Sequence, residues 1–282
     1  MAVEQSANRP TMRGITIVIL SIIASLFSTT PLLAQRHTSF GYYDVDKFYD
    51  TKPSTFYDDR AYTPEGRYCW DEERYRRKVE NIASVIDTMH LAAIALYGVE
   101  NEEVVRDIVF ASKLEYGYLH RTLSTDDGLD FALLYAGDRL FIEEVESGFD
   151  YLCIKCEFDH KPTLILLVRN SDAANTVLRE NLRQKSNRRI IIAGRTSRVN
   201  SYDFCLRDAC HKAEHRGRGN SVYKQKWQMS DRILTDSSQV ADAEVFIRDY
   251  LIDISGAPRA TFSYRRYVGG YSSKLPIYIF LD

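Results

Sequence analysis

Several features that would assign a protein to a class at once are missing from this sequence. It has no internal repeat and no linker rich in proline or glycine, with 7 Pro and 14 Gly in 282 residues. Neither sign of charge dominates, because 37 Lys and Arg face 39 Asp and Glu, giving a net charge of −2. Such a chain has no whole-molecule attraction to DNA or anionic lipid, so any such contact requires a local patch. No Ser/His/Asp triad, Cys/His pair or phosphate-binding glycine loop stands out.

The composition is that of a globular protein. Hydrophobic residues make up 45% of the chain and charged residues 27%, too apolar for disorder and too charged for a polytopic membrane protein. The 19 Tyr and 13 Phe against 2 Trp favour a sheet-rich or mixed fold. We expect a single domain over residues 35–282, which is long enough to bury a core.

The first 34 residues have the pattern of a secretory signal peptide. Arg9 and Arg13 precede an apolar run from Gly14 to Phe27, and Ala34 supplies a small residue at the cut. We therefore expect export to the periplasm or the exterior, with translation from Met1 or Met12. Mass spectrometry of protein from its host should then show loss of residues 1–34. An uncleaved anchor is the alternative, although the run is shorter than the roughly 20 residues that span a bilayer. No stable membrane span is expected.

The five cysteines are an odd number, so at least one is unpaired within the chain. Cys153 and Cys156 fall in an expected strand and should point to opposite faces, which argues against a metal knuckle or a redox pair. A second group clusters later in the chain and consists of Cys205, Cys210, His211 and His215. A local disulfide, plain surface residues and a zinc site are the three alternatives there.

The hydrophobic pattern predicts alternating helices and strands. Asp71 should cap a helix to about residue 90, and Asn101 a second helix to about Leu114. A third helix is expected at 173–184. Strands are expected at 91–97, 131–135, 140–145, 151–158, 163–168 and 189–194. The strands around Ala136–Asp138 should form one hairpin, and those around 159–162 another. This order predicts an α/β (α+β) fold with a mixed sheet, or two sheets, and helices outside.

Five ordered motifs between Gly41 and the C-terminus resemble one known family. They are Asp44-Val-Asp-Lys-Phe-Tyr-Asp50, Thr63-Pro-Glu-Gly66 through Asn81-Ile-Ala83, Leu96-Tyr-Gly-Val-Glu-Asn101, Gly128-Leu-Asp-Phe-Ala-Leu-Leu-Tyr135, and Tyr267–Ser272 with Leu275–Tyr278. The chain resembles the secreted bacterial branch of the endonuclease/exonuclease/phosphatase superfamily, which has the DNase I-like fold. The resemblance implies a four-layer α/β sandwich: two packed mixed β-sheets with helices on both outer faces. Helices 71–90 and 173–184 should then lie on opposite outer layers.

The resemblance also implies a metal-assisted hydrolysis of phosphoric esters, which needs carboxylates for Mg²⁺, histidines, and an Asp and Asn pair. At the corresponding positions this chain differs. The family's opening Asn is replaced by Asp44 and its metal-binding Glu by Gly98. One of the family's histidines corresponds to Arg169 or Asn170 in this chain. Arg195 and Ser197 occupy the positions of the family's catalytic Asp and Asn, which follow the retained Gly194. Ser273 and Lys274 occupy the positions of the Asp and His in the family's last motif. The retained residues are mainly structural, namely Asn101, Asp130, Trp227, Asp231 and the Gly-Gly of the final strand motif.

Two hypotheses follow for function. The first is a catalytically inactive binding or scaffold module that needs no cofactor. The alternative is a divergent metal-dependent phosphodiesterase or nuclease that uses Asp44 or Asp46 with Mg²⁺ or Mn²⁺. If the fold is right, seven residues should converge at one end of the sheets: Asp44, Asp46, Gly98, Asp130, Arg195, Asp231 and Lys274. Arg195 and Lys274 would either pair with the leftover acids or hold an anionic ligand. The partner is open, and strong nucleic-acid binding is not expected.

Overall fold

The computed structural model describes residues 37–169, 172–183, 188–236 and 240–281. The predicted signal peptide and Asn170 lie outside these residues. Two six-stranded sheets form the centre of the domain. The first has the order β13-β16-β1-β2-β4-β3 and comprises β13 (Glu244–Val245), β16 (Ile277–Leu281), β1 (Thr38–Phe48), β2 (Ala93–Val99), β4 (Asp130–Ala136) and β3 (Tyr116–Arg121). The second has the order β5-β6-β7-β8-β12-β9 and comprises β5 (Leu140–Gly148), β6 (Tyr151–Phe158), β7 (Lys161–Arg169), β8 (Arg189–Arg195), β12 (Arg232–Thr235) and β9 (Arg207–Asp208).

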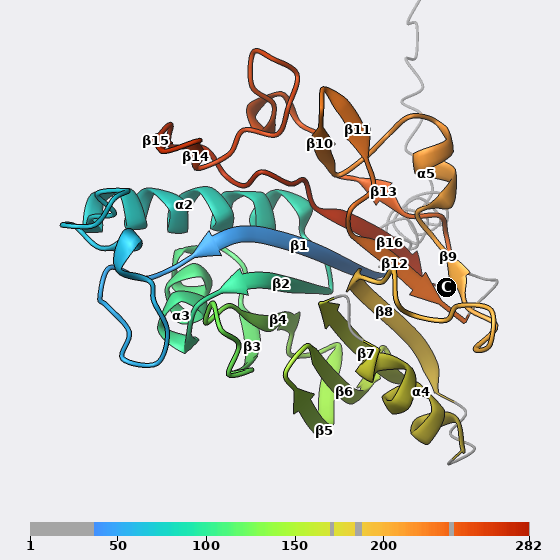
Figure 1. Cartoon of the computed structure of the whole chain (residues 1–282). Helices are drawn as coiled ribbons and strands as arrows, with labels where there is room; N and C mark the ends of the chain where they lie inside the picture. The colour runs from blue at the N-terminus through green and yellow to red at the C-terminus, as the bar shows by residue number, and fades with distance from the viewer. Residues whose placement is uncertain (1–36, 170–171, 184–187, 237–239, 282) are drawn as a thin grey trace, which may run out of the picture. The chain divides into compact units, whose positions relative to one another are not determined.

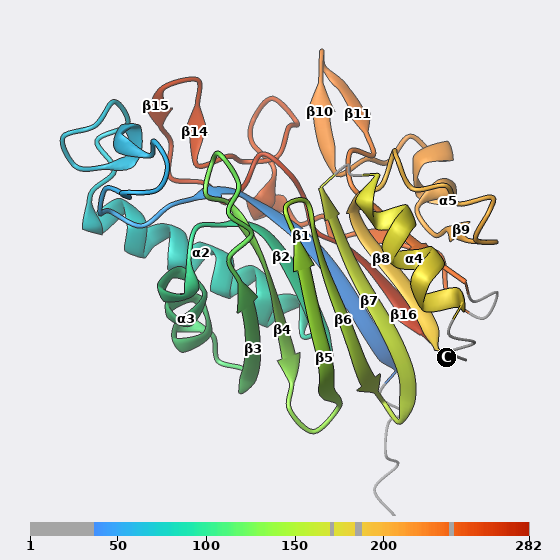
Figure 2. The same cartoon turned by 60° about the horizontal axis from the view of Figure 1, so that its bottom comes forward.

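Both sheets are mixed. β1 runs parallel to β2, and β7 runs parallel to β8, while the other paired strands in the two sheets are antiparallel. Figures 1 and 2 show the sheets packed face to face. Apolar side chains of both, such as Leu96 and Phe131 from the first and Ile165 and Ile191 from the second, share one buried core. The predicted central strands are confirmed, because β2 and β8 each lie between two neighbours and are buried along most of their length.

Helices cover the two outer faces, as predicted. α2 (Glu72–Met89) and α3 (Glu102–Ala111) lie outside the first sheet, and α4 (Ala173–Arg183) lies outside the second (Figures 1 and 2). The expected caps are present. The side chain of Asp71 accepts a hydrogen bond from the Arg74 N–H at 3.0 Å, and that of Asn101 accepts one from Val104 at 3.0 Å. Such caps satisfy amide groups that a helix start leaves unpaired. The four-layer sandwich is therefore confirmed.

One predicted hairpin is wrong. β4 and β5 flank the turn at Ala136–Asp138, but they do not pair, because β4 belongs to the first sheet and β5 to the second. The turn carries the chain from one sheet to the other. A turn signal between two apolar strands fixes a change of direction and does not specify which strand each one pairs with. The other predicted hairpin is confirmed, since β6 pairs with β7 from Phe158 and Lys161 to Tyr151 and Val168.

The cysteines are all free thiols. Cys156 lies in the core between the sheets and Cys153 in the separate cluster under α4, so their opposite orientation is confirmed. Cys205 is exposed and Cys210 is buried, and no disulfide joins them. Across residues 37–169, 172–183, 188–236 and 240–281, no group of three or more His, Cys, Asp or Glu is arranged to hold a metal ion. The local disulfide and the zinc site are therefore not formed.

Shorter elements sit around the edges of the sheets. They are the 3-10 helices η1 (Arg60–Tyr62) and η2 (Asp249–Leu251), the short helix α5 (His211–His215), and two hairpins formed by β10 (Ser221–Tyr223) with β11 (Lys226–Gln228) and β14 (Phe262–Ser263) with β15 (Arg266–Tyr267). Among the described helices, none is both long and apolar enough to cross a bilayer.

Candidate active-site cleft

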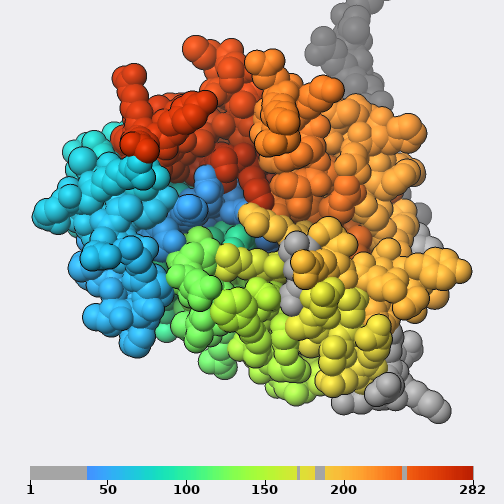
Figure 3. All heavy atoms as spheres, viewed as in Figure 1, coloured from blue at the N-terminus to red at the C-terminus, as the bar shows by residue number. Residues whose placement is uncertain are grey.

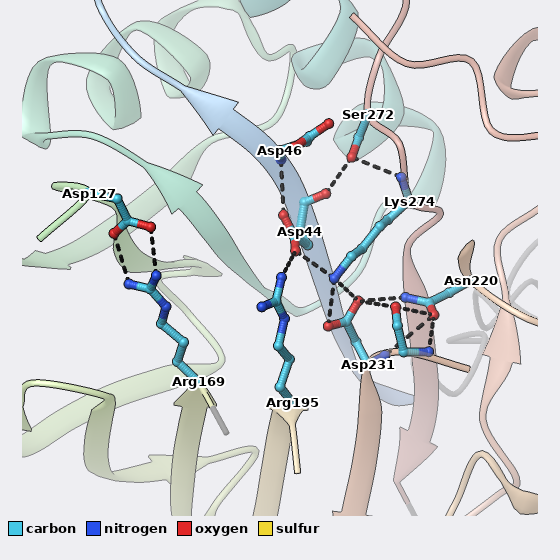
Figure 4. A network of polar contacts seen from close by, with 10 residues as sticks. Asp44, Asp46, Asp127, Arg169, Arg195, Asn220, Asp231, Ser272 and Lys274 are labelled. Carbon is cyan, nitrogen blue, oxygen red and sulfur yellow. Dashed lines mark hydrogen bonds and ion pairs between the residues drawn. The ribbon is translucent and has the colours of Figure 1, made fainter. Parts of the chain in front are cut away.

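A buried lysine joins two buried aspartates at the centre of the site (Figure 4). The Lys274 Nζ lies 2.7 Å from Oδ2 of Asp44 and 2.9 Å from Oδ2 of Asp231. Asp44 comes from β1, Asp231 immediately precedes β12, and Lys274 lies just before β16. Their side chains are at most 12% exposed. A single ammonium group therefore bridges two carboxylates from different sheets.

Hydrogen bonds hold each member of this triad in place. Asn220 donates to Oδ2 of Asp231 at 2.7 Å, and Ser230 donates to the same oxygen at 3.2 Å. The Ser272 hydroxyl donates to the main-chain oxygen of Asp44 at 2.6 Å and accepts from the Lys274 N–H at 3.1 Å. Burial alone would lower the pKa of Lys274, but the charges of Asp44 and Asp231 outweigh burial and raise that pKa. The ammonium is therefore charged at neutral pH.

Arg195 reaches the same place but is held far less tightly. Its guanidinium lies 3.8 Å from Oδ2 of Asp44, and its side chain is 46% exposed, against 12% for Lys274. It also stands 5.9 Å from the centre of the Tyr97 ring. At 3.8 Å the pair is beyond hydrogen-bonding distance. Arg195 thus keeps N–H groups directed at solvent, whereas the ammonium of Lys274 is fully engaged by carboxylates. An anion bound by both Arg195 and Lys274 does not fit this arrangement.

Arg169 makes a second ion pair beside the first. It is the parallel-strand neighbour of Arg195, at the ends of β7 and β8. Its guanidinium binds both carboxylate oxygens of Asp127, at 2.8 and 2.6 Å. Burial acts to raise the pKa of Asp127, but the hydrogen bonds and charge of Arg169 lower it overall. Asp127 was not among the residues predicted from the sequence, because it lies in a turn and its partner is 42 positions away, at the end of β7.

Gly98 lies directly against this cluster and has a backbone conformation that suits glycine. Its φ is +90°, and an added Cβ would stand 3.4 Å from Oδ1 of Asp44 and 3.3 Å from the amide nitrogen of Asp46. The pairing of β2 with β4 shifts register between Tyr97 and Val99, so the strand is locally irregular here. A glutamate at this position would carry backbone strain of about 1–2 kcal/mol. Restoring the family's metal ligand therefore requires more than adding a side chain.

The other predicted site residues lie around the triad and are not part of it. The Asp46 N–H donates to Oδ1 of Asp44 at 3.0 Å. Asp130 is used elsewhere, since its carboxylate binds His120 at 3.0 Å and the Leu123 N–H at 2.8 Å. Ser197 and Ser273 are exposed. The structure thus joins Asp44, Arg195, Asp231 and Lys274 directly, places Asp46 and Gly98 beside them, and gives Asp130 a separate partner.

Two further buried ionisable residues near the cleft were missed from the sequence. Lys78 donates to the main-chain oxygen of Asp46 at 2.6 Å, and burial lowers its pKa to about 8 despite the opposing charges of Asp46 and Asp44. Glu100 accepts from the Asp50 N–H at 2.5 Å and the Tyr57 hydroxyl at 2.9 Å. Burial raises the pKa of Glu100 to about 8, so it is largely protonated at pH 7 and adds little negative charge. One signal was present for Lys78, which lies on the apolar face of its helix three residues after Tyr75 and four before Ile82.

The residues present do not fit the Mg²⁺ ion that the family's chemistry uses. Mg²⁺ takes oxygen ligands and demands a nearly ideal octahedral arrangement. Here the Asp44 and Asp231 carboxylates face an ammonium group, Gly98 offers no side chain, and Arg195 adds a second positive charge. Coulomb repulsion from Lys274 and Arg195 opposes a divalent cation at this position. No catalytic step through a metal can be derived from this arrangement.

Comparisons with known proteins agree with this fold. Residues 39–157 match the model of the Endonuclease/Exonuclease/phosphatase family. No curated protein matches the sequence. Among solved structures, a humanized D. rerio TDP2 is similar at 13% identity, with a TM-score of 0.56 and coverage of 88% of this chain and 100% of that one. The mannosyl-6-phosphatase of Bacteroides thetaiotaomicron VPI-5482 is similar at 14% identity, with a TM-score of 0.55 and coverage of 86% and 99%.

A third similar structure is an endonuclease/exonuclease/phosphatase family protein from Bacteroides thetaiotaomicron, at 15% identity, a TM-score of 0.53 and coverage of 86% and 93%. At these identities the solved structures establish the fold alone. The fold and the cleft define an α/β sandwich of the DNase I-like class. Residues 39–157 are similar to the endonuclease/exonuclease/phosphatase family, and the solved structures share the fold of the domain.

Proposed function

We propose that this protein is a non-hydrolytic member of the endonuclease/exonuclease/phosphatase superfamily and uses the former catalytic cleft as a binding site. The observation that carries the proposal is the position of the Lys274 ammonium, 2.7 Å from Asp44 and 2.9 Å from Asp231. Both carboxylates are paired with one permanent cation of the chain, and Arg195 adds a second positive charge 3.8 Å from Asp44. In metal-dependent hydrolysis, a divalent ion would polarise a phosphoryl oxygen or lower the pKa of an attacking water. Here both carboxylates of the triad are already paired and are not free to bind such an ion.

The proton-handling residues are also replaced. General acid–base catalysis contributes roughly 10²–10⁴-fold in enzymes that use it. At the family's two histidine positions the chain has Lys274 and either Arg169 or Asn170. Lys274 is committed to two carboxylates and Arg169 to Asp127, so neither is a base at neutral pH. The lack of a general base and the poor fit for a metal ion together support a cleft that binds a ligand without hydrolysing it.

The binding group that this geometry favours is Arg195. Its side chain is half-exposed, and its contact to Asp44 is long, at 3.8 Å. Guanidinium groups bind oxyanions such as phosphate, sulfate or carboxylate through paired N–H donors. The neighbouring Arg169 is already satisfied by Asp127. We therefore assign a small oxyanion, or the anionic end of a larger ligand, to Arg195 in this cleft.

The proposal predicts no turnover together with weak oxyanion binding. The purified protein should hydrolyse neither DNA nor bis-p-nitrophenyl phosphate nor p-nitrophenyl phosphate above the rate of an Asp44→Asn variant, with Mg²⁺ or with Mn²⁺. Inorganic phosphate, titrated by NMR, should shift signals near Arg195. Arg195→Ala should weaken that binding by about tenfold, the loss of one charge-assisted contact.

Arg198→Ala is the matched control, because Arg198 is an exposed arginine three residues after Arg195 and pairs with Asp172 at 3.3 Å. It should leave phosphate binding unchanged. Metal-dependent turnover that Asp44→Asn abolishes would overturn the non-hydrolytic assignment and favour the divergent phosphodiesterase. Equal losses in the Arg195 and Arg198 variants would overturn the assignment of the anion to Arg195.

A further inference from the structure

Two segments of the chain carry only positive charge and form hairpins. Residues 215–230 contain two arginines and two lysines but no Asp or Glu, and they include the β10–β11 hairpin. Residues 254–281 contain three arginines and Lys274, again without Asp or Glu, and they include the β14–β15 hairpin. In a chain with a net charge of −2, this is a strong local imbalance. It is the kind of local patch that contact with an anionic surface requires.

The turns of these hairpins combine cations with exposed aromatic rings. Tyr264, in the β14–β15 turn, is 99% exposed and is followed by exposed Arg265 and Arg266. Tyr223, beside the β10–β11 turn, is 59% exposed, and the ammonium of Lys224 lies 5.2 Å from its ring centre. Within the part of the chain that the structure describes, no ion pair engages any of the four cations at these turns, Lys224, Lys226, Arg265 and Arg266. Their charges are therefore available to a partner.

A third exposed apolar side chain lies on a neighbouring turn. Ile254 follows Asp253, whose carboxylate accepts hydrogen bonds from the Ser255 and Ala257 N–H groups and so holds the turn. The Ile254 side chain is fully exposed. In Figures 1 and 2 this turn, the β10–β11 hairpin and the β14–β15 hairpin all project from the same side of the domain. A single exposed apolar residue is ordinary in a folded protein. Here Tyr223, Ile254 and Tyr264 lie on one side of the domain together with cations that have no ion-pair partner among the described residues, and such a grouping is typical of an interaction surface.

The base of each hairpin packs against the domain, so the exposed turns are held in position. Phe262 packs on Trp70 at 5.6 Å between ring centres and on Tyr68 at 4.9 Å. Trp227 packs partly buried against the main core. Ser221 forms a β-bridge with Lys274, which ties β10 to the cleft. Figure 3 shows the orange and red segments as a rim above a hollow in the surface. The tips therefore project from a fixed base.

We propose that these three turns dock the protein on the headgroup region of a membrane containing anionic phospholipid. The inference is independent of the function proposed for the cleft. Each basic residue near such a surface strengthens binding by about fivefold, and tyrosine rings favour the boundary between headgroups and acyl chains. Ile254 favours a membrane over a nucleic acid as the partner. An exposed aliphatic side chain is stabilised by burial among lipid chains, but it offers a base neither a stacking face nor a hydrogen bond. The described domain would contact the membrane surface through these turns.

Sedimentation with vesicles of phosphatidylcholine alone, or of phosphatidylcholine mixed with phosphatidylglycerol, tests the proposal on the full chain. We expect binding to the mixed vesicles that weakens with salt, and little binding to phosphatidylcholine. Arg265→Glu with Arg266→Glu should lower the partition coefficient by at least about 25-fold, from two contributions of about fivefold each. Ile254→Ser with Tyr264→Ser should lower it several-fold at the same charge.

The matched control is Arg106→Glu with Arg179→Glu, which changes net charge equally on exposed helix positions in α3 and α4. It should retain most of the binding, and circular dichroism should show all variants folded. The proposal is overturned if the wild-type protein ignores anionic vesicles, or if the control loses as much binding as the hairpin variant. It is also overturned if a single-stranded oligonucleotide binds these turns more tightly than the vesicles do.

Discussion

Replacing Lys274 with methionine is expected to destabilise the protein by about 3–5 kcal/mol, the usual cost of removing one partner from a buried ion pair. The substitution keeps most of the apolar volume but leaves Asp44 and Asp231 without the ammonium that lies 2.7 and 2.9 Å from them. Two buried carboxylates would then face each other. Neutralising them, by combining Lys274→Met with Asp44→Asn and Asp231→Asn, should restore much of the lost stability.

The loss should depend on pH in a defined direction. Without Lys274, which acts to lower the pKa of Asp44, burial and the charge of Asp231 would raise the folded-state pKa of Asp44 still further above its unfolded value. The folded variant then binds more protons than the unfolded chain, so its stability falls as pH rises. The deficit relative to the wild type, measured by urea denaturation at each pH, should be largest near neutral pH and smaller in mild acid.

Lys52→Met is the matched control for this experiment. Lys52 pairs with Glu103 at 3.1 Å, but its side chain is 69% exposed. An exposed ion pair contributes little to stability, because water and salt screen its charges. This variant should therefore unfold near the wild-type midpoint. A Lys274→Met protein as stable as the Lys52→Met protein at neutral pH would show that the buried triad is not a structural ion pair.

Gly194→Ala is expected to be the second large loss, at about 3 kcal/mol or more, or to prevent folding. Gly194 has a φ of +116°, and an added Cβ would stand 2.3 Å from the main-chain oxygen of Val168 on the neighbouring strand. Because both groups belong to paired β-strands, the clash cannot be relieved by a side-chain rotation. The strand ends would have to separate at the point where Arg195 enters the cleft.

Gly137→Ala supplies the comparison, since nothing lies within 4 Å of a Cβ at this position, in the turn between β4 and β5. Its midpoint of thermal unfolding should stay close to that of the wild type. The Gly194 variant should unfold at a much lower temperature or accumulate only in inclusion bodies. Equal midpoints for the two variants would contradict the close strand contact at Gly194.

Local signals predicted the helices well, because each depends on residues close in sequence. Asp71 and Asn101 cap helices through the amide three residues ahead, a relation visible without any structure. The opposite faces of Cys153 and Cys156 follow from the period of two residues in a strand. The β4–β5 connection was mispredicted, because pairing depends on which of two buried sheets a strand enters. Both sheets accept the same apolar pattern.

The site was predictable only in part, for the same reason. Asp44, Asp231 and Lys274 were found through a family resemblance, since no spacing rule joins residues 187 and 43 positions apart. The bond of Asp127 to Arg169 was missed because it depends on the packing of a loop against the end of a strand. The backbone conformation of Gly98 was also invisible, because the sequence shows a missing carboxylate but not the positive φ that would strain any other residue there.

The central claim, that a lysine of the chain holds the position a metal would need, is tested most directly by calorimetric titration of Mn²⁺ into the wild-type protein at neutral pH. The account predicts no saturable site up to millimolar Mn²⁺, and the same heats for the Asp44→Asn variant. One stoichiometric site of micromolar affinity, lost in Asp44→Asn, would contradict it.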